Sequence, residues 1–288
     1  MIKSGISPRN ILAMTFTNKA AGEMKERLIS MVGEEAIEGI WMSTFHSACI
    51  KILRRHGHLI GYQKNEKGFA TFSIYDPEDS IKLVKQIFKD LNIVGKHKEG
   101  AALSYIDTCK NKLWEPKHAA QYYASSEEEQ DFSKVYEIYQ KELLKNNAID
   151  FGDMIMKTVE VLRDHALAAS YWQNKFHYLL IDEFQDSNYA QLQLILLLSS
   201  PHFNLFAVGD FRQSIYKFRG SDISIILGFK NMFPTGKVVH LLKNYRSQSN
   251  IVNVGNYLID HNKTEFNKDL QAHHAEGKKV NVVSVGTE

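Results

Sequence analysis

Two adjacent carboxylates, Asp182 and Glu183, follow the apolar run 179–181 and are the side chains best suited to chemistry. At the end of a strand, the first carboxylate can hold Mg²⁺, usually through water, because Mg²⁺ prefers oxygen ligands and keeps part of its hydration shell. The second can orient and deprotonate an attacking water. An Asp-Glu pair can also simply end a strand, and the following Gln185-Asp186 favours the chemical interpretation.

The segment 208–220, VGDFRQSIYKFRG, combines aromatic and cationic side chains. After Gly-Asp it carries a glutamine, two aromatic residues and three cations, which are Gln213, Tyr216, Phe218, Arg212, Lys217 and Arg219. Single-stranded nucleic acid is bound by aromatic faces that stack on bases and by charges that meet phosphates. A packed surface helix with solvated charges has the same pattern, so both interpretations stay open.

Two shorter segments carry weaker signals for phosphate or base binding. Thr17, Asn18 and Lys19 open a predicted helix whose N–H groups can bind phosphate, although an ordinary capped helix looks the same. In LLKNYRSQSNI, Tyr245 can stack on a base and Arg246 can reach a phosphate.

The segment 43–57 adds a histidine and a basic face. Lys51, Arg54 and Arg55 lie about one helical turn apart, a pattern that usually marks a solvated face. His46, which follows Phe45, is more often a hydrogen-bonded structural histidine than a catalyst.

The elements that must position these side chains alternate between strand and helix on both sides of the middle of the chain. Short apolar runs predict buried parallel strands at 11–16, 40–43, 177–181, 204–208 and 238–242. Periodic apolar positions predict helices at about 18–32, 45–56 and 187–198. The strand ends carry Asp-Glu, Gly-Asp and Asn-Tyr-Arg, which fits ligand binding at the carboxyl edge of an open α/β sheet.

The middle of the chain, 76–150, is predicted to be a helical insertion. Asp76-Pro77-Glu78-Asp79 supplies a cap acceptor, a proline at the first helical position and acids in the first turn. Helical patterns continue at about 101–113, 130–146 and 151–164. The acidic stretch Ser125 to Gln130 is expected to be a loop.

Composition fits a globular protein of one large or two ordinary domains. The 288 residues include 35 Lys+Arg and 33 Asp+Glu, a net charge of +2 that excludes a histone-like basic tail but not a local basic groove. Cys49 and Cys109 form no CxxC pair, and no apolar run approaches the ~18 residues of a membrane helix. We therefore expect a cytoplasmic protein that makes no use of a membrane.

Taken in order, these segments resemble the UvrD/PcrA/Rep family of superfamily 1 DNA helicases. TFTNKAAGEM resembles motif Ia of that family, and TFHSACIKILRR resembles the motif that follows it. IDEFQD is similar to motif II (Walker B), VGDFRQSIYKFRG to motif III and LLKNYRS to motif IV. IDFGDMI, residues 149–155, is similar to the point where the chain re-enters the first motor domain. The resemblance runs from about residue 3 to about residue 264.

The resemblance implies ATP and Mg²⁺ as cofactors and assigns a role to five residues. Asp182 is expected to bind the Mg²⁺ of the nucleotide, and Glu183 to activate water. Gln213 is expected to sense the γ-phosphate, Arg246 to contact it like an arginine finger, and Tyr245 to stack on adenine.

The resemblance also implies a nucleic-acid interface. The residues of this interface are expected to line the path of a single strand or to lie near the backbone or bases of that strand. They are Phe16, Thr17, Asn18, His46, Tyr216, Phe218 and Arg219. Phe218 stands where the family often has Trp, which preserves stacking with less area. Phe211-Arg212 replaces the acidic or glutamine-rich pair usual after Gly-Asp.

The fold that the resemblance implies is an α/β, RecA-like P-loop NTPase sheet with an inserted all-helical subdomain. Its parts are the first portion of domain 1A at 1–75, the insertion 1B at 76–150, the remainder of 1A at 151–247 and the beginning of domain 2A at 248–288. Domain 1A is expected to be incomplete at its N-terminus.

A P-loop, GxxxxGK[ST], is required for phosphoryl transfer in this class, and the sequence contains none. Gly-Lys occurs at 95–96, 236–237 and 277–278, without a following Ser or Thr. We expect the chain to be the central portion of an ATP-dependent 3′→5′ DNA helicase that acts on single strands and single/double-strand junctions in a bacterial-type, nucleoid-associated cytosol. By itself the chain is expected to lack ATPase activity and to bind single strands weakly through Phe16, Phe218 and the basic helix at Lys51. A non-catalytic single-strand-binding module is the alternative; a nuclease is poorly supported, because no second carboxylate cluster with a nearby lysine stands out.

Overall fold

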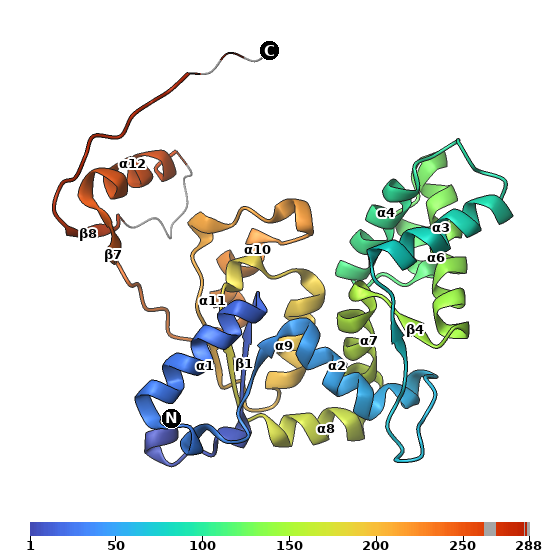
Figure 1. The fold of residues 1–288 in the computed structure, drawn as a ribbon, viewed down its shortest axis with the longest axis horizontal. Helices are drawn as coiled ribbons and strands as arrows, with labels where there is room; N and C mark the ends of the chain where they lie inside the picture. Colours follow the sequence, from blue (N-terminus) through green and yellow to red (C-terminus); the bar gives the residue numbers. More distant parts are fainter. Residues whose placement is uncertain (262–268, 285, 287–288) are drawn as a thin grey trace. The chain divides into compact units, whose positions relative to one another are not determined.

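The computed structural model describes residues 1–261, 269–284 and 286, and it divides into two compact units, Met1–Ile226 and Leu227–Glu288 (Figure 1). In the first unit, four parallel strands form a sheet in the order β2-β1-β5-β6. The strands are β1 (Ile11–Thr15), β2 (Trp41–Thr44), β5 (Tyr178–Ile181) and β6 (Leu205–Ala207). Every residue of β1 is buried, as expected for a continuous apolar run in a parallel sheet. The predicted α/β class is confirmed.

Helices connect the strands of this sheet and stabilise it by packing. The helices of this part are α1 (Asn18–Val32), α2 (Phe45–His56), α7 (Phe151–Asp164), α8 (Ala166–Lys175), α9 (Tyr189–Ser199) and α10 (Ile223–Leu227). Helix α7 packs against α2, α8 and α9. The predictions for α1, α2, α7 and α9 are confirmed, whereas α8 was not anticipated, because its apolar residues follow no clear helical stripe.

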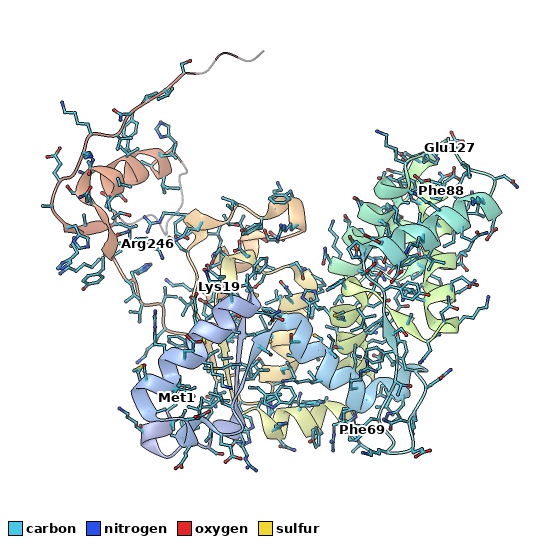
Figure 2. The ribbon with its side chains drawn as sticks, viewed as in Figure 1. Met1, Lys19, Phe69, Phe88, Glu127 and Arg246 are labelled. Atoms are coloured by element: carbon cyan, nitrogen blue, oxygen red, sulfur yellow. The ribbon has the colours of Figure 1, made fainter. Side chains whose placement is uncertain are left out.

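The region between β3 (Ser73–Ile74) and β4 (Ala148–Ile149), which pair in parallel, is helical and has its own core. Its helices are α3 (Pro77–Asp90), α4 (Glu99–Asn111), α5 (Pro116–Tyr122) and α6 (Glu127–Lys145). Phe88, labelled in Figure 2, is buried in that core. The loop predicted at Ser125 to Gln130 is wrong from residue 127 on. Ser126 forms a capping box with Glu129, and the three glutamates 127–129 favour the positive end of the helix, so α6 begins there.

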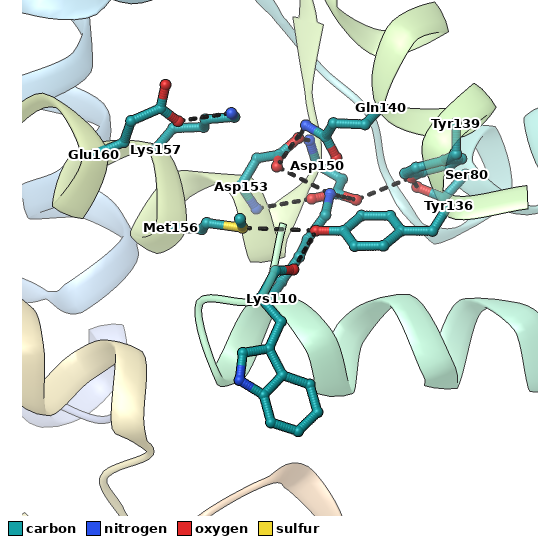
Figure 3. A network of polar contacts seen from close by, with 11 residues as sticks. Ser80, Lys110, Tyr136, Tyr139, Gln140, Asp150, Asp153, Met156, Lys157 and Glu160 are labelled. Atoms are coloured by element: carbon teal, nitrogen blue, oxygen red, sulfur yellow. Dashed lines mark hydrogen bonds and ion pairs between the residues drawn. The ribbon is translucent and has the colours of Figure 1, made fainter. Parts of the chain in front are cut away.

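A buried ion-pair network lies where this helical region meets α7 (Figure 3). The Lys110 ammonium contacts Asp150 at 2.7 Å and Asp153 at 2.9 Å, and its side chain is 0% exposed. Tyr139 donates a hydrogen bond to Asp150, and Gln140 donates to Asp153. Gly152 leaves room for this lysine, because a Cβ there would lie 2.8 Å from Lys110 Cδ. The network connects α4 and α6 to the start of α7.

The second unit contains α11 (Phe229–Met232), β7 (Lys243–Gln248), α12 (Ser249–Ile259) and β8 (Gln271–His274). The strand predicted at Val238 to Leu242 is wrong. Val239 and Leu241 are 78% and 84% exposed, and the described residues give this segment no partner strand. A strand needs a run of ladder hydrogen bonds. Leu242 O accepts one from the Gln271 N–H at 2.8 Å, but the paired residues begin at Lys243, opposite Gln271 of β8.

Candidate functional site

The carboxyl edge of the sheet brings the ends of β1, β5 and β6 together. The backbone N–H of Asp182 donates to Met14 O at 3.0 Å, and that of Phe184 donates to Val208 O at 2.9 Å. A pocket of about 520 Å³ opens at this edge. It is lined by Phe16, Thr17, Ala20, Asp182, Glu183, Gln185, Asp186, Arg212, Gln213, Ile215 and Tyr216. Six of the residues predicted from the sequence therefore share one cavity, namely Phe16, Thr17, Asp182, Glu183, Gln213 and Tyr216.

Glu183 has a left-handed backbone, with φ 52° and ψ 45°. This conformation is uncommon for a residue other than glycine, and such strain often occurs at functional sites. It lies between β5 and the 3₁₀ turn Phe184–Asp186, so the chain turns sharply at the two acids. Asp182 is half-buried in the pocket while the neighbouring Glu183 is exposed, and the two carboxylates have different environments.

Gln185 connects the two segments that line this pocket. Its side chain is buried, its Nε2 donates to Glu183 Oε2 at 2.7 Å, and its Oε1 accepts from the Asp210 backbone N–H at 3.0 Å. Asp210 in turn accepts from Gln213 Nε2 at 3.0 Å and from Arg212 Nε at 3.3 Å. Sequence analysis assigned no role to Gln185 or Asp210. The sequence offered two signals for these roles. Gln185 is an amide close to two acids, and Asp210 is an acid that follows Gly209.

Burial shifts two carboxyl groups in the pocket toward the neutral form. Desolvation, and then the charge of Glu183, raise the pKa of Asp182 and that of Asp186. Asp186 Oδ1 is buried without a hydrogen-bond partner among the described residues. A cation or a water-bound cation near these acids would lower both pKa values again, which fits the donor set of a site for hydrated Mg²⁺. The described residues contain no group of three or more His, Cys, Asp or Glu side chains that could hold a metal alone. A metal here therefore needs further ligands, such as phosphates and water.

An aromatic row extends from the pocket, formed by Phe16, Tyr216 and Phe218. The rings of Phe16 and Tyr216 stack at 5.4 Å with an interplanar angle of 25°, and Tyr216 and Phe218 are 6.0 Å apart. Arg219 lies 5.3 Å from the Tyr216 ring and 5.6 Å from the Phe218 ring. Phe218 is 78% exposed, so its face is available to a base. The structure thus favours the stacking interpretation of 208–220 over a packed surface helix, since this segment forms only two 3₁₀ turns.

Thr17, Asn18 and His46 lie at the same edge of the sheet. The Thr17 hydroxyl caps α1 by accepting from the Ala20 N–H at 3.1 Å, and Asn18 is the first residue of that helix. Lys19 follows in the first turn (Figure 2). His46 is half-buried with its ring edge-on to Phe151 at 5.9 Å, and burial lowers its pKa, so the imidazole is neutral at pH 7. The neutral His46 imidazole can form hydrogen bonds with a strand of nucleic acid but adds no positive charge.

Tyr245 and Arg246 lie on β7 of the second unit. The Tyr245 ring is exposed, with the His273 ring at 4.9 Å and the Lys243 ammonium at 5.3 Å. The Arg246 N–H donates to Asn244 Oδ1 at 3.0 Å. The roles of both residues stay predictions.

The basic face of α2 is not part of the aromatic row. Strands β1 and β2 are parallel, with Leu12 opposite Trp41 and Thr15 opposite Thr44. Phe16 therefore follows the carboxyl edge, while Lys51 lies 4.7 Å from the ring of Trp41 at the amino edge. At about 3.3 Å per residue the two edges are roughly 10 Å apart along the strands. The predicted binding of single strands through Phe16, Phe218 and the basic helix at Lys51 stays a prediction, in which the strand would reach from one edge of the sheet to the other.

Comparison with known proteins identifies the class. The family described as UvrD/REP helicase N-terminal domain matches residues 1–234, and the chain belongs to this family. Its sheet is accordingly a RecA-like motor sheet, as predicted. The chain is 43% identical over 284 residues to the ATP-dependent DNA helicase PcrA of Staphylococcus epidermidis and 42% identical over 284 residues to that of Staphylococcus aureus. Each match covers 98% of this chain and 38% of the relative. Among the residues that the structure describes, no helix is long and apolar enough to cross a membrane.

Proposed function

We propose that this chain is the central portion of an ATP-dependent 3′→5′ DNA helicase that couples hydrolysis to movement on single-stranded DNA and to duplex unwinding. One observation carries the proposal. The acids suited to hydrolysis and the first two rings of the aromatic row line the same pocket of about 520 Å³. Nucleotide and single strand would then contact neighbouring residues of one pocket, so that a shift at one would reach the other, as coupling of hydrolysis to translocation requires.

The hydrolytic roles are those that the family resemblance implies for each side chain. Asp182 would hold Mg²⁺ together with phosphate oxygens and water, and the metal would neutralise charge that develops on the phosphates. Glu183 would take the proton from the attacking water, and Gln213 would contact the γ-phosphate. Arg246 would stabilise the same phosphate, and Tyr245 would stack on adenine.

The nucleic-acid roles centre on the aromatic row. Phe16, Tyr216 and Phe218 would stack on successive bases, and Arg219 would meet the backbone. Thr17, Asn18 and His46 would provide hydrogen bonds at the same edge. Single/double-strand junctions in a bacterial-type, nucleoid-associated cytosol would be the setting, with DNA repair among the processes served.

We propose further that this chain alone hydrolyses no ATP. The 288 residues contain no GxxxxGK[ST] segment, so the amides and lysine that hold the β- and γ-phosphates are missing from it. Its own activity would then be binding of single-stranded nucleic acid, which is also the second candidate function, that of a non-catalytic module. The exposed Phe218 ring favours such binding.

Fluorescence anisotropy of a labelled oligo(dT) strand tests the binding. Phe16→Ala/Phe218→Ala is expected to weaken affinity by about 30-fold or more, because stacking contributes about 1–3 kcal/mol per base and the variant removes two rings. The control Tyr122→Ala/Tyr257→Ala removes two exposed aromatic rings outside the row and should bind like the wild type. Equal affinity of all three proteins contradicts the proposed interface. DNA-stimulated ATP hydrolysis that Glu183→Gln abolishes would contradict the proposed lack of activity.

A further inference from the structure

A second pocket, of about 310 Å³, lies at the amino edge of the sheet, between α2 and α8. We name it the amino-edge pocket. It is defined by four cations, Lys51, Arg54, Arg55 and Lys175, around the rings of Trp41 and Trp172. No acid lines it. The function proposed above makes no use of it, because the aromatic row and the acids lie at the opposite edge.

The positive charge of this pocket is uncompensated. None of the four cations forms an ion pair with a carboxylate in the part of the chain that the structure describes. Desolvation, followed by repulsion from Arg55 and Lys51, lowers the pKa of Lys175. Lys51 and Arg55 are exposed, and Arg54 and Lys175 are half-buried. Like charges gathered at one place raise the free energy of the unliganded protein, and an anion would relieve that cost.

The cations are already fixed on aromatic rings. Lys51 and Lys175 lie 4.7 and 4.2 Å from the Trp41 ring, and Arg55 lies 4.2 Å from the Tyr171 ring. Trp172 stacks on Phe176 at 5.6 Å. Lys51, Lys175 and Arg55 thereby cover part of the aromatic surface of the pocket. They also hold the charged groups in place, so less side-chain entropy is lost when an anion binds.

The remaining surface of the pocket is apolar. Ile50 contributes to the wall, and Phe69 and Tyr171 remain 42% and 39% exposed at the pocket (Phe69 is labelled in Figure 2). A phosphate backbone offers nothing to bury against such a surface. A peptide in which carboxylates flank an aromatic or aliphatic side chain offers both an anion and an apolar group. A cavity of this size is large enough for one such side chain.

We propose that the amino-edge pocket binds an acidic segment of a partner protein, in which Asp or Glu residues flank one large apolar residue. The carboxylates pair with Lys51, Arg55 and Lys175, and the apolar side chain packs against Phe69 and Tyr171. Because the pocket opens at the edge opposite the aromatic row, the partner and a single strand can be bound at the same time.

A fluorescein-labelled 12-residue peptide of alternating Glu and Leu, with one central Phe, tests this in anisotropy titrations of the full chain. Lys51→Gln/Lys175→Gln is expected to weaken binding at least tenfold. The matched control Lys25→Gln/Lys85→Gln removes the same charge from exposed positions and should bind normally. A peptide with Gln in place of every Glu should fail to bind, and an all-Glu peptide without apolar residues should bind at least fivefold more weakly.

The results of these titrations distinguish an acidic peptide from a nucleic acid as the occupant of the amino-edge pocket. Equal binding by the two double variants, or no binding by the wild type at 50 mM salt, overturns the proposal. Displacement of the peptide by oligo(dT) in a Phe16→Ala/Phe218→Ala background also overturns it and assigns the pocket to nucleic acid. Circular dichroism confirms that the variants fold, and the single variant Arg55→Gln repeats the test where the double variant is unstable. Trp41 and Trp172 fluorescence should change on binding in the wild type.

Discussion

Replacement of Lys110 by Met removes the cation that contacts two buried acids, Asp150 and Asp153. The side chains of Lys110, Asp150 and Asp153 are 0%, 8% and 0% exposed. Removal of one partner of a buried ion pair leaves an uncompensated charge and typically costs about 3–5 kcal/mol. Asp150 keeps its bond from Tyr139 and Asp153 keeps its bond from Gln140, which prevents a larger loss. We expect Lys110→Met to lose about 3–5 kcal/mol of unfolding free energy at pH 7.

The pH dependence of that loss identifies its cause. Burial acts against the charged form of Lys110, but Asp150 and Asp153 outweigh it and raise its pKa, so the wild type loses this stability only when pH rises above the unfolded value of about 10.4. Burial raises the pKa of Asp153 despite Lys110, while at Asp150 Lys110 outweighs burial and lowers the pKa. Without the lysine, both folded pKa values rise, and protonation restores stability as pH falls. The deficit of the variant should therefore shrink between pH 7 and pH 5.

Urea unfolding followed by far-ultraviolet circular dichroism measures both effects. Lys85→Met, at an exposed position of α3, is the control and should change stability by less than about 0.5 kcal/mol. Lys110→Met/Asp150→Asn/Asp153→Asn, which removes these three charges, should recover part of the loss and show a weaker pH dependence, which comes from Asp107, a neighbouring acid whose pKa desolvation raises to about 6. The reasoning would be refuted if the free energy of unfolding of Lys110→Met lay within about 1 kcal/mol of the wild-type value. A loss of stability that stayed constant from pH 7 to pH 5 would refute it as well.

Two further changes test the geometry around the candidate site. Gln185→Leu keeps the side-chain volume but removes the acceptor of the Asp210 N–H and the donor to Glu183. We expect urea unfolding to show that the free energy of unfolding falls by about 1–3 kcal/mol. An unchanged unfolding midpoint would contradict the connecting role of Gln185. Gly220→Ala places a Cβ 2.9 Å from Asn111 Nδ2, at a residue whose φ is +87°. Thermal unfolding should show a loss of about 1–2 kcal/mol in the free energy of unfolding. The control Gly22→Ala adds a Cβ into open space on α1 and should show no loss.

The strands and long helices around the candidate site were predictable because their signals are local. The buried run at β1, the cap at Thr17 and the acids after β5 each depend on residues adjacent in the chain. The strand expected at Val238 to Leu242 failed because an apolar run does not specify its own pairing partner. The short helices α5 and α8 were missed because little periodicity develops over 7 and 10 residues.

Burial of charged groups could not be predicted in the same way. A lysine is almost always exposed, and nothing next to Lys110 in the chain indicates that two acids about 40 residues away enclose it. Likewise the basic face of α2 was recognised as a pattern, but its place at the amino edge of the sheet was not predicted. Its position depends on which end of β2 the second half of the helix reaches, which only the folded chain shows.

The hydrogen bonds around Gln185 give the proposed coupling a physical route. Gln213 donates to the Asp210 carboxylate, the Asp210 N–H donates to Gln185, and Gln185 donates to Glu183. In the proposed helicase, a Gln213 that turns toward the γ-phosphate must give up its bond to Asp210. Tyr216 lies only three residues further along the same segment and stacks on Phe16. In this proposal, a shift of the turn at 211–213 would reach the aromatic row through the covalent chain.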